Sequence, residues 1–178
     1  MRVMGIDPGL RNTGWGVIDA EGNRLSHVAN GVLRPDASCD TAERLLQLHE
    51  GLVTVLRRYR PDSAAVETSL SNRNAASTLK LGMARGTALV AAALQAIEVR
   101  EYLPMIVKKA VVGTGHADKR QVAMMVARLL PGCDIAAADA ADALAVAICH
   151  AHNSATDRRW SEGGASAPAG RTAEGRRQ

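Results

Sequence analysis

Aromatic residues are nearly absent from this sequence. They make up 2% of its 178 residues, and there is no phenylalanine. The core must therefore be built from aliphatic side chains, and stacking of bases on aromatic rings cannot be the main way in which the protein holds nucleic acid. Hydrophobic residues still reach 47%, which excludes a chain that is disordered throughout.

Cysteines and long apolar runs are also scarce. Cys39, Cys133 and Cys149 are odd in number and widely spaced, which argues against a disulfide framework and against a structural zinc site. No run reaches the roughly eighteen apolar residues that span a bilayer, and no early stretch resembles a signal peptide. We therefore expect a cytoplasmic protein with no membrane partner. The net charge of +4 permits a phosphate-bearing partner without requiring one.

The order of apolar patterns predicts one domain with an α/β fold. Three antiparallel strands are followed by a crossover helix, a strand parallel to an earlier one, a helix, a fifth strand and two more helices. This order is typical of the ribonuclease H-like architecture, a mixed five-stranded sheet flanked by helices. The expected strands are 3–7, 13–19, 24–33, 63–67 and 97–102, and the expected helices are 41–60, 75–96, about 118–130 and about 136–151.

Two features concern the edges of this domain. The helix expected at 75–96 is rich in Ala and Gly, so it could pack closely against a second copy of the chain. Beyond residue 153 the composition turns to Ser, Gly, Ala and Arg without periodicity. We therefore predict a folded domain over residues 1–153 and a disordered polar tail over 154–178.

Two predicted strands end on a carboxylate. The first apolar run stops at Asp7, directly before the turn residues Pro8 and Gly9, and the strand expected beside it ends at Glu67. A charge at such a place is costly unless it is paired, hydrogen-bonded or bound to a cation. The alternative for Asp7 is that it caps the turn that follows.

Asp139 and Asp142 form a second acidic pair, in an otherwise almost entirely apolar helix. Their spacing of three places both on one helix face, where like charges repel. A cation between them would remove the conflict. Alternatively, both lie in the first helical turn, where the macrodipole favours negative charge.

The four acids together suit hard divalent ions. Mg²⁺ takes oxygen ligands and commonly completes its shell with water and substrate phosphate oxygens. Two such ions can activate a water and stabilise the leaving oxygen, so the predicted reaction is phosphodiester hydrolysis with two Mg²⁺ ions per site, for which Mn²⁺ could substitute. The predicted metal ligands and catalytic acids are Asp7, Glu67, Asp139 and Asp142.

Basic residues are candidates for contacts with phosphate. Lys108 and Lys119 flank the break at 113–115 and could stabilise negative charge in the transition state, and Arg73 follows Glu67 in a loop. For each of these three the alternative is a solvated surface position. His150 and His152, at spacing i and i+2, point to different sides of a helix and are not expected to bind the metal.

Four segments resemble one known family, the RuvC Holliday-junction resolvases of bacteria. They are GIDPGLRNTGWGV, VETSLSNRNAASTLKLGMARG, VKKAVVGTGHADKRQV and DAADALAVAICHAH. The resemblance implies a ribonuclease H-like homodimer that uses Mg²⁺ to nick two symmetry-related strands of four-way junction DNA, in recombination and repair. It also implies a branch-migration motor as a partner. The family's acids fall on Asp7, Glu67, Asp139 and Asp142, and its active-site lysines on Lys108 and Lys119.

The sequence departs from the family at several positions. Leu70 stands where an aromatic residue usually stacks on a junction base, so contact of this position with DNA is expected to be weaker. Thr68 and Met83 replace glutamines, and Met105 with Ile106 replaces a polar pair. We expect these changes to affect junction opening and sequence preference. The four acids are intact.

Two other functions compete with a junction nuclease. A catalytically silent junction-binding protein of the same fold would tolerate the departures, although it would have no reason to keep four carboxylates together. An actin-like ATPase or sugar kinase also begins with a strand that ends on Asp, but it needs two lobes and a much longer chain.

Overall fold

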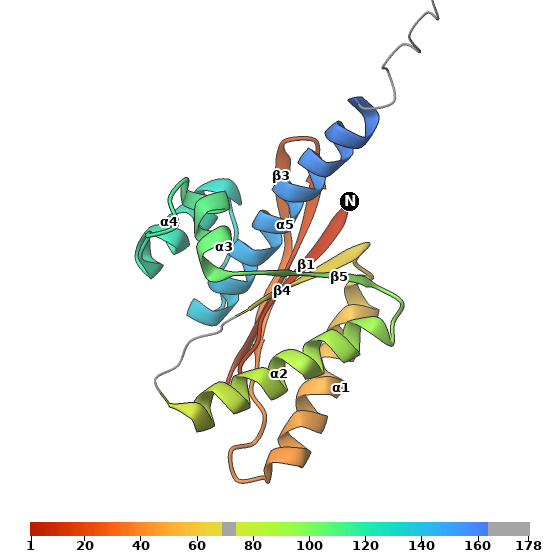
Figure 1. The fold of residues 1–178 in the computed structure, drawn as a ribbon, viewed down its shortest axis with the longest axis vertical. Helices are drawn as coiled ribbons and strands as arrows, with labels where there is room; N and C mark the ends of the chain where they lie inside the picture. The colour runs from red at the N-terminus through yellow and green to blue at the C-terminus, as the bar shows by residue number, and fades with distance from the viewer. Residues whose placement is uncertain (69–73, 164–178) are drawn as a thin grey trace, which may run out of the picture.

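One mixed sheet organises the molecule. A computed structural model describes residues 1–68 and 74–163, with residues 155–163 as backbone only. The strand order is β3-β2-β1-β4-β5 (Figure 1). β2 is antiparallel to β1 and β3, whereas β4 is parallel to β1 and β5, so the predicted topology is confirmed. The strands are β1 (Arg2–Asp7), β2 (Thr13–Glu21), β3 (Arg24–Leu33), β4 (Ser63–Glu67) and β5 (Glu98–Tyr102).

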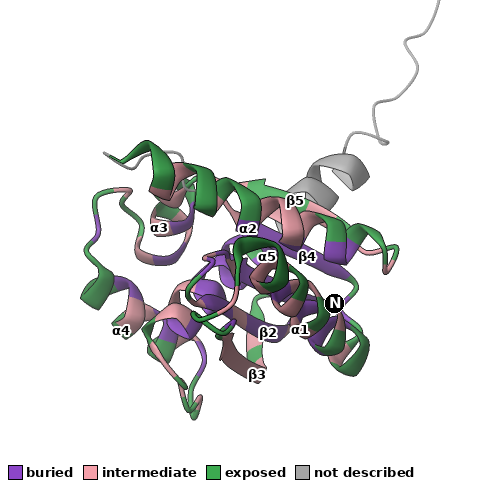
Figure 2. Ribbon diagram, turned by 90° about the horizontal axis from the view of Figure 1, so that it is seen from below, coloured by how far each residue is buried: buried purple, intermediate pink, exposed green. Residues whose placement is uncertain are grey.

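Helices pack on both faces of this sheet. α1 (Thr41–Tyr59) and α2 (Ala75–Ala93) share one apolar core with Met4 and Ile6 of β1. α3 (Pro104–Val112), α4 (Lys119–Leu129) and α5 (Ala138–Gly163) share a second core with Val3. β1 is thus buried from both sides, as its continuous apolar run predicts. Figure 2 shows the burial concentrated on the central strands and on α5.

Two helices begin at the side-chain caps that the sequence pattern indicates. The Asp40 carboxylate accepts the Glu43 backbone N–H at 2.9 Å, ahead of α1. Asp118 and Gln121 form a reciprocal capping box ahead of α4, which places Lys119 at the first position of that helix. The two starts therefore agree with the sequence pattern.

Helix α3 has no counterpart among the elements expected from the sequence. Pro104, expected only to end the fifth strand, also occupies the first helical turn, where its missing N–H leaves no intrahelical bond unmade. Gly113 ends the helix with φ of 88°, which favours glycine. A proline that stops a strand can equally begin a helix, so the pattern alone did not separate the two.

The end of the last helix was predicted wrongly. α5 continues to Gly163, so it is longer than 136–151, and residues 154–163, expected as part of the disordered tail, are helical. No glycine or proline interrupts the sequence before Gly163, so nothing breaks the backbone hydrogen bonds. The loss of apolar periodicity marks where the helix leaves the core, not where it ends. The division into domain and tail stays a prediction.

Helix α5 lies directly against the backbone of β1 and β2. A Cβ at Gly5 would collide with the backbone of Ala143 and Ala147, and one at Gly14 would collide with the backbone of Asp139. The absence of side chains at these glycines lets the helix approach closely. This contact fixes where the acidic first turns of α5 stand relative to the sheet.

The helices of the structure can be compared with the length and apolarity of a membrane span. Across the described residues, no helix has the length and apolar character that crossing a bilayer requires.

Candidate active site

Asp7 and Glu67 come together because their strands are parallel neighbours. β1 and β4 pair in register from Val3 with Ser63 to Ile6 with Val66, so both strands deliver their last residue to the same edge of the sheet. The sequence placed each acid at a strand end, and the predicted pairing of the two strands brings them to one place.

The two remaining acids lie at the start of α5, which packs against β1 and β2. α5 starts at Ala138, so Asp139 lies in its first turn and Asp142 lies one turn further along the same face. The macrodipole therefore accounts for Asp139 at most, because its effect falls off within the first turn. The placement of Asp142 needs another explanation.

A cleft of about 280 Å³ collects five of the six predicted catalytic residues. Asp7 and Glu67 come from the sheet, Asp142 from α5, Lys108 from α3 and Lys119 from the start of α4. Asp139 does not line the cleft, although its charge acts on Asp7 and Lys119. The remaining lining is an apolar wall that the sequence reasoning missed, formed by Pro104, Val107, Val122 and Ala145.

The surroundings of Asp7 oppose its ionisation. Burial raises the pKa of Asp7 to about 7, and the charges of Glu67, Asp142 and Asp139 act in the same direction, while Lys119 partly opposes them. No described residue donates a hydrogen bond to its carboxylate. The turn after Asp7 is instead closed by Thr13, whose hydroxyl donates to the Gly9 carbonyl at 2.7 Å and accepts the Gly9 N–H. The turn-capping alternative is therefore wrong, and Asp7 instead lines a cleft together with Glu67 and Asp142.

Lys119 is the cation nearest to the acids. Its ammonium donates to Asp142 Oδ2 at 2.9 Å, and this hydrogen bond raises the pKa of Lys119. The Lys119 side chain is 81% exposed whereas Asp142 is 20% exposed, so the lysine reaches into the cleft from solvent. The cleft is lined by three carboxyl groups and two lysines, so the lysines do not match the acids in number.

The donor set fits a hard divalent ion, although the cage is open. Among the side chains of residues 1–68 and 74–154, no three His, Cys, Asp or Glu converge closely enough to enclose a metal. All four candidate ligands offer carboxylate oxygens, which Mg²⁺ prefers.

The other predicted site residues divide into two groups. Leu70 and Arg73 lie outside the described residues. His150 is buried in the core, where its Nδ1 lies 2.9 Å from the Tyr102 hydroxyl and its Nε2 3.0 Å from Ser63 Oγ. The expectation that His150 is not a metal ligand agrees with these contacts.

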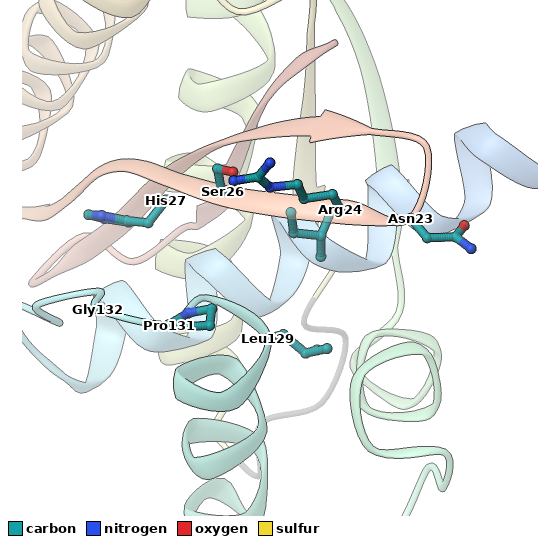
Figure 3. A pocket seen from close by; sticks show the side chains of 8 residues that line it. Asn23, Arg24, Ser26, His27, Leu129, Pro131 and Gly132 are labelled. Atoms are coloured by element: carbon teal, nitrogen blue, oxygen red, sulfur yellow. The ribbon is translucent and has the colours of Figure 1, made fainter.

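A larger hollow lies elsewhere, between β3 and the end of α4. Its volume is about 530 Å³, and it is lined by residues 23–27 together with Leu129, Pro131 and Gly132 (Figure 3). None of the side chains that line it is a carboxylate. The larger of the two cavities is therefore not the one that holds the acids. The side chains that line the smaller cleft identify it as the candidate active site.

The sheet order and the acidic edge define a class of protein. A five-stranded sheet with three antiparallel strands, two parallel ones and acids at the shared strand ends is the ribonuclease H-like fold. The sequence profile described as "Crossover junction endodeoxyribonuclease RuvC" matches residues 3–150. The chain belongs to the RuvC family of crossover junction endodeoxyribonucleases, and the fold and enzyme class predicted from the sequence are confirmed.

Relatives and solved structures agree with this assignment. A RuvC of Paramagnetospirillum magneticum is 61% identical over 89% of this chain and 96% of its own length. One from Gluconacetobacter diazotrophicus is 60% identical over 92% and 97%. The structure of T. thermophilus RuvC in complex with Holliday junction substrate matches with a TM-score of 0.82 and 37% identity, over 88% of this chain and 96% of that one. The yeast mitochondrial resolvase Ydc2, 13% identical with a TM-score of 0.67, supports the fold alone.

Proposed function

We propose that this protein resolves Holliday junctions by Mg²⁺-dependent hydrolysis of two symmetry-related phosphodiester bonds. The observation that carries the proposal is Asp7, a partly buried acid surrounded by three further acids, without a hydrogen-bond donor among the described residues. A divalent cation resolves that conflict, and the family supplies a substrate whose cleavage uses one.

Asp7, Glu67, Asp139 and Asp142 are the proposed metal ligands, with room for two Mg²⁺ ions, which Mn²⁺ could replace. When bound, such ions activate water and stabilise the leaving oxygen of a phosphodiester. Asp7 and Glu67 are held by strands, so their backbone positions are fixed before metal arrives. Lys119 holds only Oδ2 of Asp142, so the other carboxylate oxygen can bind an ion.

The two lysines are proposed to act on the phosphate. Lys119 has further ammonium hydrogens that can donate to a phosphate oxygen in the cleft, and Lys108 on α3 lines the same cleft. Charge-assisted donors of this kind stabilise the negative charge that develops in the transition state. Leu70 and Arg73 remain proposed DNA contacts on the basis of the family resemblance.

Paired cutting requires two active sites, and α2 supports a homodimer. Leu79, Val90 and Leu94 at or just after this helix are 61%, 53% and 67% exposed, which is unusual for large apolar side chains on one helix. A Cβ at Gly82 or Gly86 would meet nothing within 4 Å, so this side of the helix leaves room for a second helix to approach. A branch-migration motor as a further partner rests on the family resemblance alone.

The test compares a labelled four-way junction with a linear duplex of the same sequence, in Mg²⁺ and in EDTA. We expect paired, symmetric nicks in the junction only, in Mg²⁺ only. Binding of the junction without cuts under Mg²⁺ or Mn²⁺ would instead indicate the silent junction-binding protein.

A further inference from the structure

We propose that the N-terminal tip of α3, formed by Leu103, Pro104, Met105 and Ile106, contacts unstacked DNA bases beside the active-site cleft. We call these four residues the apolar tip. The inference rests on the proposed function, because the bases belong to the strand that the cleft would cut. It names a surface that would distinguish junctions from intact duplex.

The apolar tip is exposed and continuous with the cleft. Leu103, Met105 and Ile106 are 42%, 55% and 39% exposed, and Pro104 between them lines the cleft. Lys108, one turn after Pro104, lines the same cleft. A strand held with its phosphate at Lys108 and the acids therefore has its neighbouring nucleotides next to the tip.

The chemistry of the tip fits bases and not phosphates. None of its four side chains carries a charge or a hydrogen-bonding group, so it cannot compensate a phosphate. Apolar side chains such as Leu, Ile, Met and Pro do contact base faces, as wedges placed between partly unstacked steps. An intact duplex hides those faces in its stack, whereas a branch point exposes them.

Aromatic side chains do not fill this role in the described part of the protein. Trp15 packs on Tyr59 with ring centroids 5.6 Å apart, and both are partly buried against the core. Tyr102 is also partly buried, with its hydroxyl at His150. The aliphatic tip is therefore an exposed apolar surface beside the cleft that a base can contact.

The tip is also held in place. Pro104 restricts the backbone at the first helical turn. Met105 lies against Gly115 in the loop before α4, where an added Cβ would stand 2.5 Å from Met105 Cγ. A braced surface loses little conformational entropy when it contacts a base, which favours its use in recognition.

The test replaces two of the three exposed residues by polar ones of similar length, Met105→Gln with Ile106→Gln. Leu46→Gln on α1 is the matched control, because Leu46 is 55% exposed and does not line the cleft. Binding to a four-way junction and to duplex is measured in Ca²⁺ or EDTA, single-turnover cleavage is measured in Mg²⁺, and 2-aminopurine near the branch point reports unstacking. The oligomeric state of each variant is measured by light scattering.

We expect the double variant to bind the junction about tenfold more weakly, the range of losing one good base contact, with duplex binding unchanged. The 2-aminopurine signal should fall, and Leu46→Gln should behave as wild type. Unchanged junction binding, or an equal loss on duplex, would overturn the proposal, and dissociation to monomers would identify the tip as an interface between copies. A wild-type protein that neither binds nor cuts junctions would overturn the proposed function itself, and the base contact with it.

Discussion

The two ends of the β1–β2 ladder each carry an aspartate, in opposite surroundings. At one end Asp19 lies opposite Arg2, whose Nε and Nη2 donate to its two carboxylate oxygens at 2.9 Å each. The guanidinium holds the pKa of Asp19 below its usual value. At the other end Asp7 lies opposite Gly14, and burial with neighbouring acids raises its pKa to about 7.

The difference shows how to separate a structural acid from a functional one. Asp19 has its counter-charge within the protein, on a partly exposed surface where such a pair contributes at most about 1 kcal/mol. For Asp7, the charge of Lys119 only partly opposes burial and the neighbouring acids, so its environment favours a ligand that supplies positive charge. Residue type and strand position alone do not distinguish the two aspartates. The charged side chains around each aspartate and its burial make the difference.

Asp7→Asn should give the largest effect. We expect junction cleavage to fall by roughly a thousandfold or more, because several kcal/mol of metal-ion stabilisation of the transition state are lost. Junction binding should stay within a few-fold of wild type. Asp19→Asn is the matched control, and its single-turnover rate should match wild type. Equal losses in both variants, or loss of folding in Asp7→Asn, would remove the contrast between the two ends.

Lys119→Met should come next. We expect a fall of roughly a hundredfold in the single-turnover rate, the size typical of losing one donor to a developing negative charge. Lys109→Met is the control, because Lys109 is exposed and does not line the cleft. If the cleavage rate of Lys109→Met fell as much as that of Lys119→Met, cleavage would depend on the total positive charge of the protein and not on this position.

The pH dependence of stability should differ in sign at the two ends when metal is absent. The pKa of Asp7 is raised from 3.8 to about 7, so its favourable contribution is present at low pH and is lost as pH rises towards 7. In EDTA, Asp7→Asn should therefore gain about 2–3 kcal/mol relative to wild type between pH 5 and pH 8.

Asp19 should behave in the opposite way. Because its pKa is lowered, its contribution is present above pH 4 and is lost only as pH falls further. Urea unfolding of wild type and both variants at pH 5 and pH 8 checks this pair of expectations. A stability difference for Asp7→Asn that does not change with pH would contradict the environment described for Asp7.

Gly14→Ala tests the packing that holds α5 over Asp7. The added Cβ meets the backbone of Asp139, so the helix must move, at a cost of about 1–3 kcal/mol in stability and with a loss of cleavage. Gly51→Ala on α1 is the control, because its Cβ would meet only the flexible Leu33 side chain at 3.0 Å. Thermal unfolding and cleavage of both variants are measured. Full activity in Gly14→Ala would show that α5 does not need this close contact.

Much of the fold was readable from the sequence because its signals are local. The apolar runs, the caps at Asp40 and Asp118 and the turn at Pro8 each act within a few residues. The end of α5 was not readable, because a helix that leaves the core loses its apolar pattern before it loses its hydrogen bonds. Helix α3 was missed because Pro104 can end one element and begin the next.

The sequence by itself determined the four acids, their places at strand ends and on one helix face, and the family to which the chain belongs. Only the tertiary structure decided that Thr13, and not Asp7, closes the first turn, and that Lys119 holds Asp142. It also decided that Pro104 lines the cleft and that its neighbours Met105 and Ile106 are exposed. The physical reason is that burial and charge coupling depend on distances across the chain, which arise only when β1, β4, α3, α4 and α5 pack together.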